Sequence, residues 1–361
     1  MVRQTALLLM IFLTACAPRG EITVDPGAGS VGKVQDIFVG STRNDDGGRS
    51  EKVSFGRIDV SVPPNRKPGT ISYPKEGQQP NPATDFLVTK EVRYGSGRAF
   101  ESALRQKLAS EPRGNRDIIL FVHGYNNTFA EGLYRFAQFS HDLNIPGVEM
   151  HFAWPSAGRP LAYVRDRDSA MISRNGLVET IDAAVDSGAR QVIIVGHSMG
   201  AYLVMESLRQ MAISGQRDKL NRIGGVVLMS PDIDVDLFRA QAHDIGKLPE
   251  PFLIFASSRD KALNLSAMIS REPVRLGTLT DARPISDLKV TLIDNSAFST
   301  GDGHFNAATS PAMISLLSRI SQLSDAFQGD GGQVGLFTGA ALTVERAAQV
   351  VLSPADQLLR R

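Results

Sequence analysis

A glycine–serine–glycine pattern is the feature of this sequence with the clearest chemistry. Residues 196–200 read Gly-His-Ser-Met-Gly, with Ser198 at the centre. The β-branched residues before them predict a strand, and the periodic residues 201–211 predict a helix after them. A serine on such a strand–turn–helix is exposed on a sharp turn, at a helix N-terminus that favours an oxyanion. The pattern therefore predicts a nucleophilic serine, although an ordinary tight turn with a buried hydroxyl would give the same letters.

A serine hydroxyl needs a base that takes its proton and a carboxylate that orients the base. Where the serine stands on a turn of this kind, the chain order is serine, acid, histidine. Two histidines follow Ser198, namely His243 and His304. His243 falls in a predicted helix, whereas His304 follows the last predicted strand in a glycine-containing loop. We therefore expect His304 to be the base.

The acid has several candidates among the aspartates that follow predicted strands. Chain order favours Asp260, which lies four residues past a strand and before the segment with the histidine. Asp232 follows the preceding strand and is the alternative acid, and Asp294 and Asp302 are further candidates. The alternating aspartates that begin at Asp232 do not match a calcium loop, because Leu237 stands where an EF-hand needs glycine. We expect neither a metal nor an organic cofactor.

The loop after the first strand of the series predicts an oxyanion hole. Residues 123–127 read His-Gly-Tyr-Asn-Asn. A loop at this place donates one backbone N–H to the developing negative charge, and the residue after the serine donates another. Gly124 allows close approach, so the expected donors are the N–H groups of Tyr125 and Met199. We interpret His123 as a structural residue that holds the loop.

These residues must be positioned by alternating strands and helices. The predicted strands are 117–122, 148–153, 192–195, 225–229, 252–256 and 290–293, and the predicted helices are 98–110, 129–143, 161–187, 201–213 and 312–323. Apolar strands with helical crossovers indicate an α/β fold, with a mostly parallel sheet and helices on both faces. Residues 36–97 predict antiparallel strands at the sheet edge. Ligands bind at the carboxyl ends of parallel strands, where the candidate residues lie.

Several blocks of this sequence together resemble a bacterial α/β-hydrolase family of unknown function. The blocks are residues 37–43, 123–129, 154–156, 197–200, 230–234 and 258–263, in that order. The resemblance spans about residues 36–320. It implies the α/β-hydrolase fold, with Ser198 as nucleophile and with Asp260 and His304 completing a catalytic triad. It implies no particular substrate.

The start of the sequence predicts export and a lipid anchor. Residues 5–13 form an apolar segment that is too short to span a bilayer but suits a signal peptide. Residues 13–16 read Leu-Thr-Ala-Cys and resemble a bacterial lipobox, and Cys16 is the only cysteine of the chain. The resemblance implies cleavage before Cys16 and acylation, with chains such as palmitate. Ala17 at the next position implies an outer-membrane lipoprotein that faces the periplasm. A plain signal peptide cut after Ala17 is the alternative.

Composition and organisation complete the prediction. The chain has 361 residues, of which 42% are hydrophobic, so it can bury a full core. With 39 basic and 38 acidic residues and no basic stripe, it predicts no nucleic-acid partner. We expect a signal peptide at 1–15, a flexible tether at 16–35, the α/β-hydrolase domain at 36–324 and an appendage with a helical pattern at 325–361.

The predicted function is an envelope-anchored serine hydrolase of the esterase or lipase type. Its substrate would be a small-molecule or lipid ester, cleaved through an acyl-enzyme. Two other functions stay open, because a fold does not determine function. One is an acyltransferase that uses an alcohol in place of water, and the other is a catalytically silent binding protein of the cell envelope.

Overall fold

The computed structural model describes residues 19–270, 274–298, 303–304, 309–310, 314 and 348–351. The predicted signal peptide, Cys16 and Asp302 lie outside the described residues, and so does most of the predicted helix 312–323. In the part of the chain that is described, no helix has both the length and the apolar character needed to cross a membrane.

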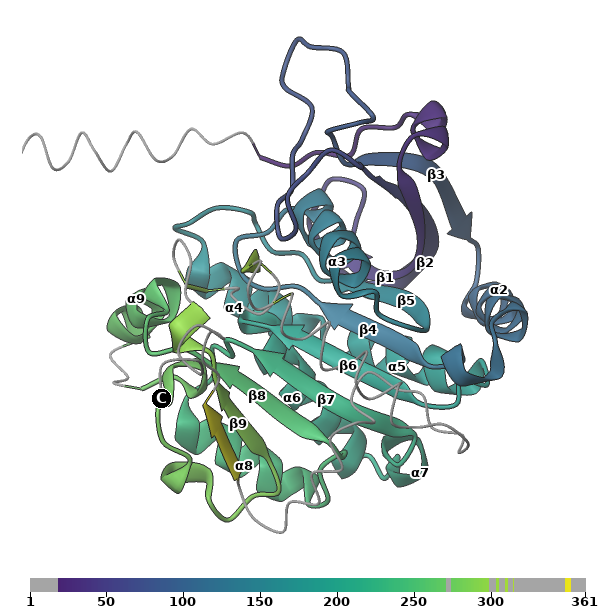
Figure 1. Cartoon of the computed structure of the whole chain (residues 1–361). Helices are drawn as coiled ribbons and strands as arrows, with labels where there is room; N and C mark the ends of the chain where they lie inside the picture. Colours follow the sequence, from purple (N-terminus) through teal and green to yellow (C-terminus); the bar gives the residue numbers. More distant parts are fainter. Residues whose placement is uncertain are drawn as a thin grey trace, which may run out of the picture.

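One sheet forms the centre of the molecule (Figure 1). Among the described residues it has ten strands in the order β10-β9-β8-β7-β6-β4-β5-β1-β2-β3. The strands are β1 (Lys33–Arg43), β2 (Arg49–Val62), β3 (Leu87–Tyr94), β4 (Ile118–Val122), β5 (Val148–Ala153), β6 (Val192–His197), β7 (Ile223–Met229), β8 (Phe252–Ala256), β9 (Thr291–Asp294) and β10 (Ala348–Val351). All neighbours from β10 to β1 are parallel, and β1, β2 and β3 are antiparallel. This confirms the predicted α/β fold and the antiparallel edge.

Helices cover both faces of this sheet. They are α2 (Gly97–Ser110), α3 (Phe129–Leu143), α4 (Tyr163–Ile172), α5 (Arg174–Asp186), α6 (Met199–Ile213), α7 (Arg217–Leu220), α8 (Val235–Ile245) and α9 (Lys261–Ser270). Side chains of α2, α5, α6 and α8 form one core cluster, and α3 packs in the other. There are two clusters because successive side chains of a strand point to opposite faces of the sheet. In β4, Ile118 and Leu120 point into the first cluster and Ile119 points into the second. In Figure 1, α3 lies in front of the sheet and α6 behind it.

The predicted helix 161–187 is two helices. Helix α4 ends and α5 begins at Ser173, a buried residue that serves as C-cap of one and N-cap of the other. The Ser173 hydroxyl donates to the carbonyl of Ser169 and accepts from the hydroxyl of Thr42. A side chain that bonds to nearby backbone in this way favours a helix end or bend.

The N-terminal tether predicted for 16–35 is wrong from Arg19 onward, because these residues pack on the domain. Val24 bridges to Val88 in β3, and a short 3-10 helix, η2 (Pro26–Ser30), follows with Ala28 fully buried. Glycine and proline suggested flexibility, but here proline begins a helical turn that the Asp25 side chain caps. Strand β1 then begins at Lys33, before the predicted domain start at 36.

The C-terminal appendage also differs from its prediction where it is described. Residues 348–351 form strand β10, which pairs in parallel with β9 at the edge of the sheet. We expected a helical pattern in this region. The exposed backbone edge of β9 accepts a further strand, and Val350 and Val351 are residues that favour one.

Candidate active site

The turn between β6 and α6 places Ser198 in an unusual conformation. Ser198 has φ 53° and ψ −122° and is the N-cap residue of α6. Its N–H donates to the carbonyl of Met229 in β7, and its carbonyl accepts from the backbone N–H of Asp232 at 3.2 Å. Strand β7 and the residues that follow it therefore hold the turn in place. A positive φ at a residue other than glycine costs free energy and persists only where the surroundings enforce it. The strain supports a functional reading of the predicted serine turn.

Glycines around the serine are required by close packing. A Cβ on Gly196 would lie 2.8 Å from the Ala201 Cα, and a Cβ on Gly200 would lie 2.3 Å from the His123 carbonyl oxygen. A Cβ on Gly124 would lie 2.9 Å from the Ser198 Cβ. The loop after β4 therefore lies directly against the serine turn, as the sequence predicted for an oxyanion loop.

Asp260 and His304 meet at this edge of the sheet. The Nδ1 of His304 lies 2.8 Å from Oδ2 and 3.0 Å from Oδ1 of Asp260, which is fully buried. Asp260 also accepts from the Leu263 N–H at 2.9 Å, so the same carboxylate caps the start of α9. In serine hydrolases the base has this arrangement, with Nδ1 toward a carboxylate and Nε2 as the nitrogen that exchanges the proton.

His197 connects His304 to the serine turn. Its ring centroid lies 4.7 Å from that of His304, and its Nε2 lies 3.3 Å from the His304 carbonyl oxygen. Burial, and next the nearby His304, lower the pKa of His197 well below its usual value. A neutral His197 beside Ser198 therefore supports the segment that carries His304.

Ser198 and His304 line one cavity of about 380 Å³. Gly124, Tyr125 and Asn126 of the oxyanion loop line the same cavity. Tyr125 and Met199 carry the N–H groups predicted as oxyanion donors, and within the described part of the chain neither group donates a hydrogen bond. An oxyanion hole consists of two such N–H groups beside the reacting serine.

The loop after β4, which the sequence predicted as an oxyanion loop, is held by side chains on both sides. The Asn127 amide donates to the carbonyls of Gly124 and Tyr125, and the Asn127 N–H donates to the Ser156 hydroxyl. Helix α3 begins directly afterwards with Thr128 and Glu131 as a reciprocal capping box. Because its backbone is fixed before any ligand arrives, the loop can direct an N–H at a developing charge without reorganising.

His123 has the structural place that the sequence predicted. Its ring stacks on Trp154 at 5.0 Å between centroids, its Nε2 lies 3.0 Å from the Trp154 carbonyl oxygen, and the Trp154 indole N–H donates to the His123 carbonyl. Burial, followed by the charge of Arg43, lowers the pKa of His123 well below its usual value. This histidine is a neutral scaffold residue.

The structure does not bring the alternative acid to His304. Asp232 accepts from the Tyr163 hydroxyl at 2.9 Å and the Ser266 hydroxyl at 2.6 Å, and its Oδ1 lies 3.4 Å from Nε of Arg275. Burial, and next the charge of Asp232, raise the pKa of Tyr163 to about 12, so its hydroxyl stays a donor. This carboxylate is committed to a buried network beneath the cavity.

The remaining candidates within the described residues, Asp294 and His243, have other partners. Asp294 accepts from the Ser296 N–H at 2.9 Å. His243 lies on α8, with its side chain 58% exposed and its Nε2 3.2 Å from Asp287. Among the described residues, no group of three or more His, Cys, Asp and Glu side chains could hold a metal ion.

Sequence reasoning missed the residues that α4 and α9 bring to the cavity. Tyr163, Leu263, Leu265, Ser266 and Ile269 line it. Each belongs to a helix whose periodicity shows only that one face is buried, so no local signal marks these positions as part of a site.

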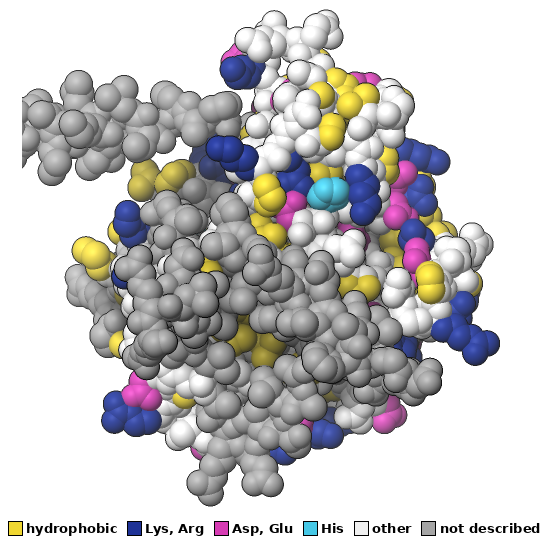
Figure 2. All heavy atoms as spheres, viewed as in Figure 1, with side chains coloured by type: hydrophobic (Ala, Val, Ile, Leu, Met, Phe, Trp, Pro, Cys, Tyr) yellow, Lys and Arg dark blue, Asp and Glu magenta, His cyan; other side chains and the backbone are white. Residues whose placement is uncertain are grey.

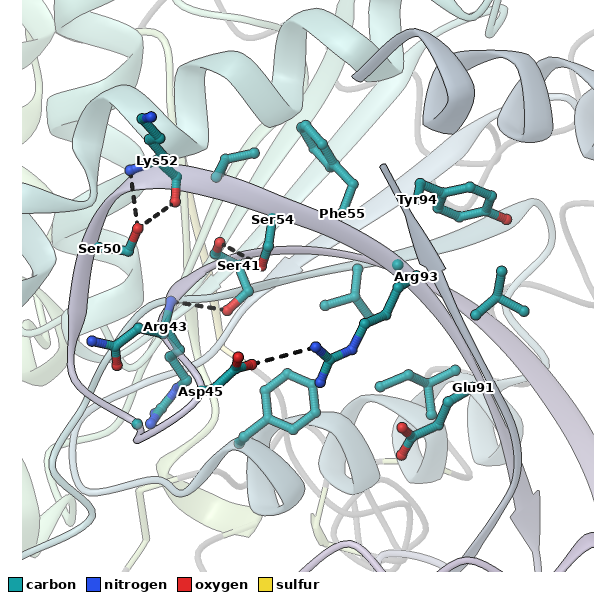
Figure 3. A pocket seen from close by; sticks show the side chains of 18 residues that line it. Ser41, Arg43, Asp45, Ser50, Lys52, Ser54, Phe55, Glu91, Arg93 and Tyr94 are labelled. Carbon is teal, nitrogen blue, oxygen red and sulfur yellow. Dashed lines mark hydrogen bonds and ion pairs between the residues drawn. The ribbon is translucent and has the colours of Figure 1, made fainter. Parts of the chain in front are cut away.

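A larger cavity of about 680 Å³ lies on strands β1, β2 and β3 (Figure 3). Figure 3 shows Arg93 and Asp45 pointing toward each other across it, as an exposed ion pair of 3.4 Å. The described residues that line this cavity include serines but no histidine. A serine there lacks the base that a nucleophile needs. Of these two cavities, the smaller one has both a serine and a histidine in its lining.

Several solved structures are similar to this chain at low identity. A protein from Agrobacterium vitis S4 described as a hydrolase is 14% identical with a TM-score of 0.34, over 80% of this chain and 98% of that one. One of two fungal esterases from Rhizomucor miehei is 13% identical with a TM-score of 0.35, over 84% and 86%. Naproxen esterase from Bacillus subtilis is 11% identical with a TM-score of 0.30, over 82% and 94%.

Family membership is decided by the sequence profile instead. No curated protein matches the chain. Residues 96–319 match the profile of one family, and this range contains Ser198, Asp260 and His304. The match agrees with the parallel sheet and with the serine turn at the end of β6. The chain belongs to the family described as alpha/beta hydrolase of unknown function (DUF900).

Proposed function

We propose that this protein is a serine hydrolase that cleaves carboxylic esters. The observation that carries the proposal is the buried Asp260 carboxylate bound to Nδ1 of His304, in a cavity that this histidine shares with the strained Ser198. A carboxylate, an imidazole and a serine in this order are the parts that activate a hydroxyl near neutral pH.

The reaction follows from these atoms. The Ser198 hydroxyl attacks the ester carbonyl carbon while Nε2 of His304 takes its proton, and Asp260 stabilises the resulting imidazolium. The carbonyl oxygen becomes an oxyanion that the N–H groups of Tyr125 and Met199 bind. The tetrahedral intermediate then collapses, and the leaving alcohol receives the proton from His304. Water attacks the acyl-serine in the same way and releases the acid.

The same proposal includes an anchor in the cell envelope. The lipobox-like residues 13–16 support acylation of Cys16, which would hold the enzyme at the periplasmic side of the outer membrane. Acyl chains on an N-terminal residue anchor a protein without any transmembrane helix. Metabolic labelling with an alkyne fatty acid tests this, and a Cys16→Ser variant that is labelled as strongly as the wild type would contradict it.

A fluorophosphonate probe tests the enzymatic proposal directly, because it reacts with an activated serine. We expect labelling of the full-length protein that disappears in Ser198→Ala. Ser214→Ala is the matched control, since Ser214 is exposed at the other end of α6. An unlabelled wild-type protein with an intact fold would favour the silent binding protein. Hydrolysis of short-chain nitrophenyl esters then separates an esterase from an acyltransferase that is active only with an alcohol acceptor.

A further inference from the structure

Exposed apolar side chains lie on and next to segments that line the Ser198 cavity. Pro160 and Tyr163 line the cavity on one side, and Leu265 and Ile269 of α9 line it on another. Leu161 is 100% exposed, Val164 69% and Met268 76%, and Leu265 and Ile269 are each more than half exposed. We call Leu161, Val164, Leu265, Met268 and Ile269 the apolar rim.

The two halves of the apolar rim are held together. The hydroxyl of Tyr163, the first residue of α4, lies 2.9 Å from the hydroxyl of Ser266 in α9. Figure 1 shows α4 and α9 on the same side of the molecule, and Figure 2 shows hydrophobic side chains over α9 at the left edge of the view. Exposed apolar side chains gathered around a site entrance mark a surface that contacts something apolar.

The N-terminal segment reaches this same entrance. The Arg19 guanidinium donates to Oδ1 of Asn126 at 3.1 Å and to the Asn126 carbonyl at 2.7 Å, and it pairs with Glu131 at 2.6 Å. Asn126 lines the cavity next to Tyr125. Thr128 and Glu131 also bind the backbone of Gly20, so this end of the chain is fastened to the start of α3.

Chain length then limits how far Cys16 can lie from the cavity. Cys16 precedes Arg19 by three positions, and three residues span at most about 10 Å. An acyl chain on Cys16 would therefore enter the membrane close to the oxyanion loop. The three positions between Cys16 and Arg19 therefore bound the distance from an acyl anchor to the start of α3.

The charges near the apolar rim suit an anionic lipid surface. In residues 155–165 and 261–270 the charged side chains are Arg159, Arg165 and Lys261, all basic and exposed. Asp166 and Asp260, the carboxylates directly next to these two ranges, are fully buried, and Asp168, further along α4, is exposed. Basic residues around an apolar surface favour membranes with anionic head groups.

We propose that the apolar rim docks on a lipid bilayer and that the substrate is an ester lipid that enters the cavity from that bilayer. This inference rests on the proposed chemistry of Ser198, whose substrate class it names. The short link from Arg19 to Cys16 turns the cavity entrance toward the membrane, and the apolar rim covers the path of an acyl chain from the bilayer to the serine.

Fluorescence quenching tests the docking without any need for activity. The full-length protein is reconstituted in vesicles of phosphatidylethanolamine and phosphatidylglycerol, with an environment-sensitive dye on Met268→Cys or on Ile213→Cys. Ile213 is a matched position, 62% exposed at the end of α6 opposite Ser198. Brominated lipids should quench the dye at 268 at least fivefold more than the dye at 213. Equal quenching at the two positions would overturn the docking. A dye at 268 that is shielded from water in the absence of vesicles would also overturn it, because a second copy or a protein partner would then cover the apolar rim.

Kinetics test the substrate class. Leu161→Asp with Met268→Asp changes two residues of the apolar rim that do not line the cavity. We expect at least a tenfold lower rate on an ester lipid in vesicles and an unchanged rate on a soluble butyrate ester. The control is Val31→Asp with Ile213→Asp, which should change neither rate. Equal rates of the rim variant and the wild type on vesicle lipid would overturn the inference. A wild type inactive on both esters would refute the proposed function and leave the quenching result to decide the docking.

Discussion

Replacement of Asp260 by asparagine should prevent His304 from acting as the base and should leave the fold intact. In the wild type, Oδ1 accepts from the Leu263 N–H at 2.9 Å and Oδ2 lies 2.8 Å from Nδ1 of His304. The asparagine oxygen can keep the bond to Leu263, and asparagine caps a helix as well as aspartate does. Its amide group then faces His304 and donates to Nδ1, so the proton of the neutral ring moves to Nε2.

A histidine protonated on Nε2 cannot accept the proton of Ser198. Loss of the correct tautomer costs about 10⁴-fold in kcat in serine enzymes of this design, or roughly 5.4 kcal/mol at about 1.36 kcal/mol for each factor of ten. We therefore expect kcat of Asp260→Asn on nitrophenyl butyrate to fall by about 10³- to 10⁴-fold. The melting temperature should stay within about 3 °C of the wild type, because the helix cap is kept.

Matched variants make this result decisive. Asp294→Asn changes an aspartate at the end of β9 that caps Ser296 and does not contact His304. Its kcat should stay within about twofold of the wild type. Retention of more than a tenth of wild-type kcat in Asp260→Asn, together with a thousandfold loss in Asp232→Asn, would refute our assignment of the acid.

Three further substitutions test packing and electrostatics. Gly200→Ala should destabilise the protein by about 2 kcal/mol or more in urea unfolding, because its Cβ would lie 2.3 Å from the His123 carbonyl oxygen. Asp232→Asn should cost about 3 kcal/mol in the same measurement, since it removes the carboxylate beside the buried Arg275. Burial raises the pKa of Glu149 to about 8. The carboxyl of Glu149 loses its proton near its usual pKa of 4.5 in the unfolded chain, but only near 8 in the folded protein. The wild-type free energy of unfolding should therefore decrease as the pH rises from 4.5 to about 8. The Glu149→Gln variant should show a smaller decrease over the same pH range.

Each of these substitutions has a control or a contradicting outcome. Gly95→Ala meets no atom within 4 Å and should change stability by less than about 0.5 kcal/mol. Arg93→Ala breaks an ion pair whose side chains are 85% and 91% exposed, so it should be close to neutral. If Arg93→Ala and Asp232→Asn lowered the free energy of unfolding equally, burial of the ion pair would not explain the cost of Asp232→Asn. A Glu149→Gln variant whose stability declines with pH as the wild type does would assign the titration to another group.

Local sequence was sufficient for the elements next to the serine. Helix 129–143 was predicted with its observed bounds, because its apolar spacing is regular. The strand before Ser198 and the helix after it were also predicted, since β-branched residues and glycines leave few alternatives at this turn. The predictions for the tether and the appendage were wrong because these segments contact residues that are far away in the sequence. The pairing of β10 with β9 is an example.

The sequence by itself determined the chemistry that is available: a serine on a turn bounded by glycines, a later histidine, and several aspartates after strands. Only the tertiary structure decided which aspartate meets the histidine. Asp232 and Asp260 follow adjacent parallel strands, β7 and β8, so their local signals are nearly the same. Their partners differ because Tyr163 and Arg275, brought in from distant segments, surround one carboxylate, while the segment of His304 folds back onto the other. Such pairings depend on how separate elements pack, and no short stretch of sequence contains that information.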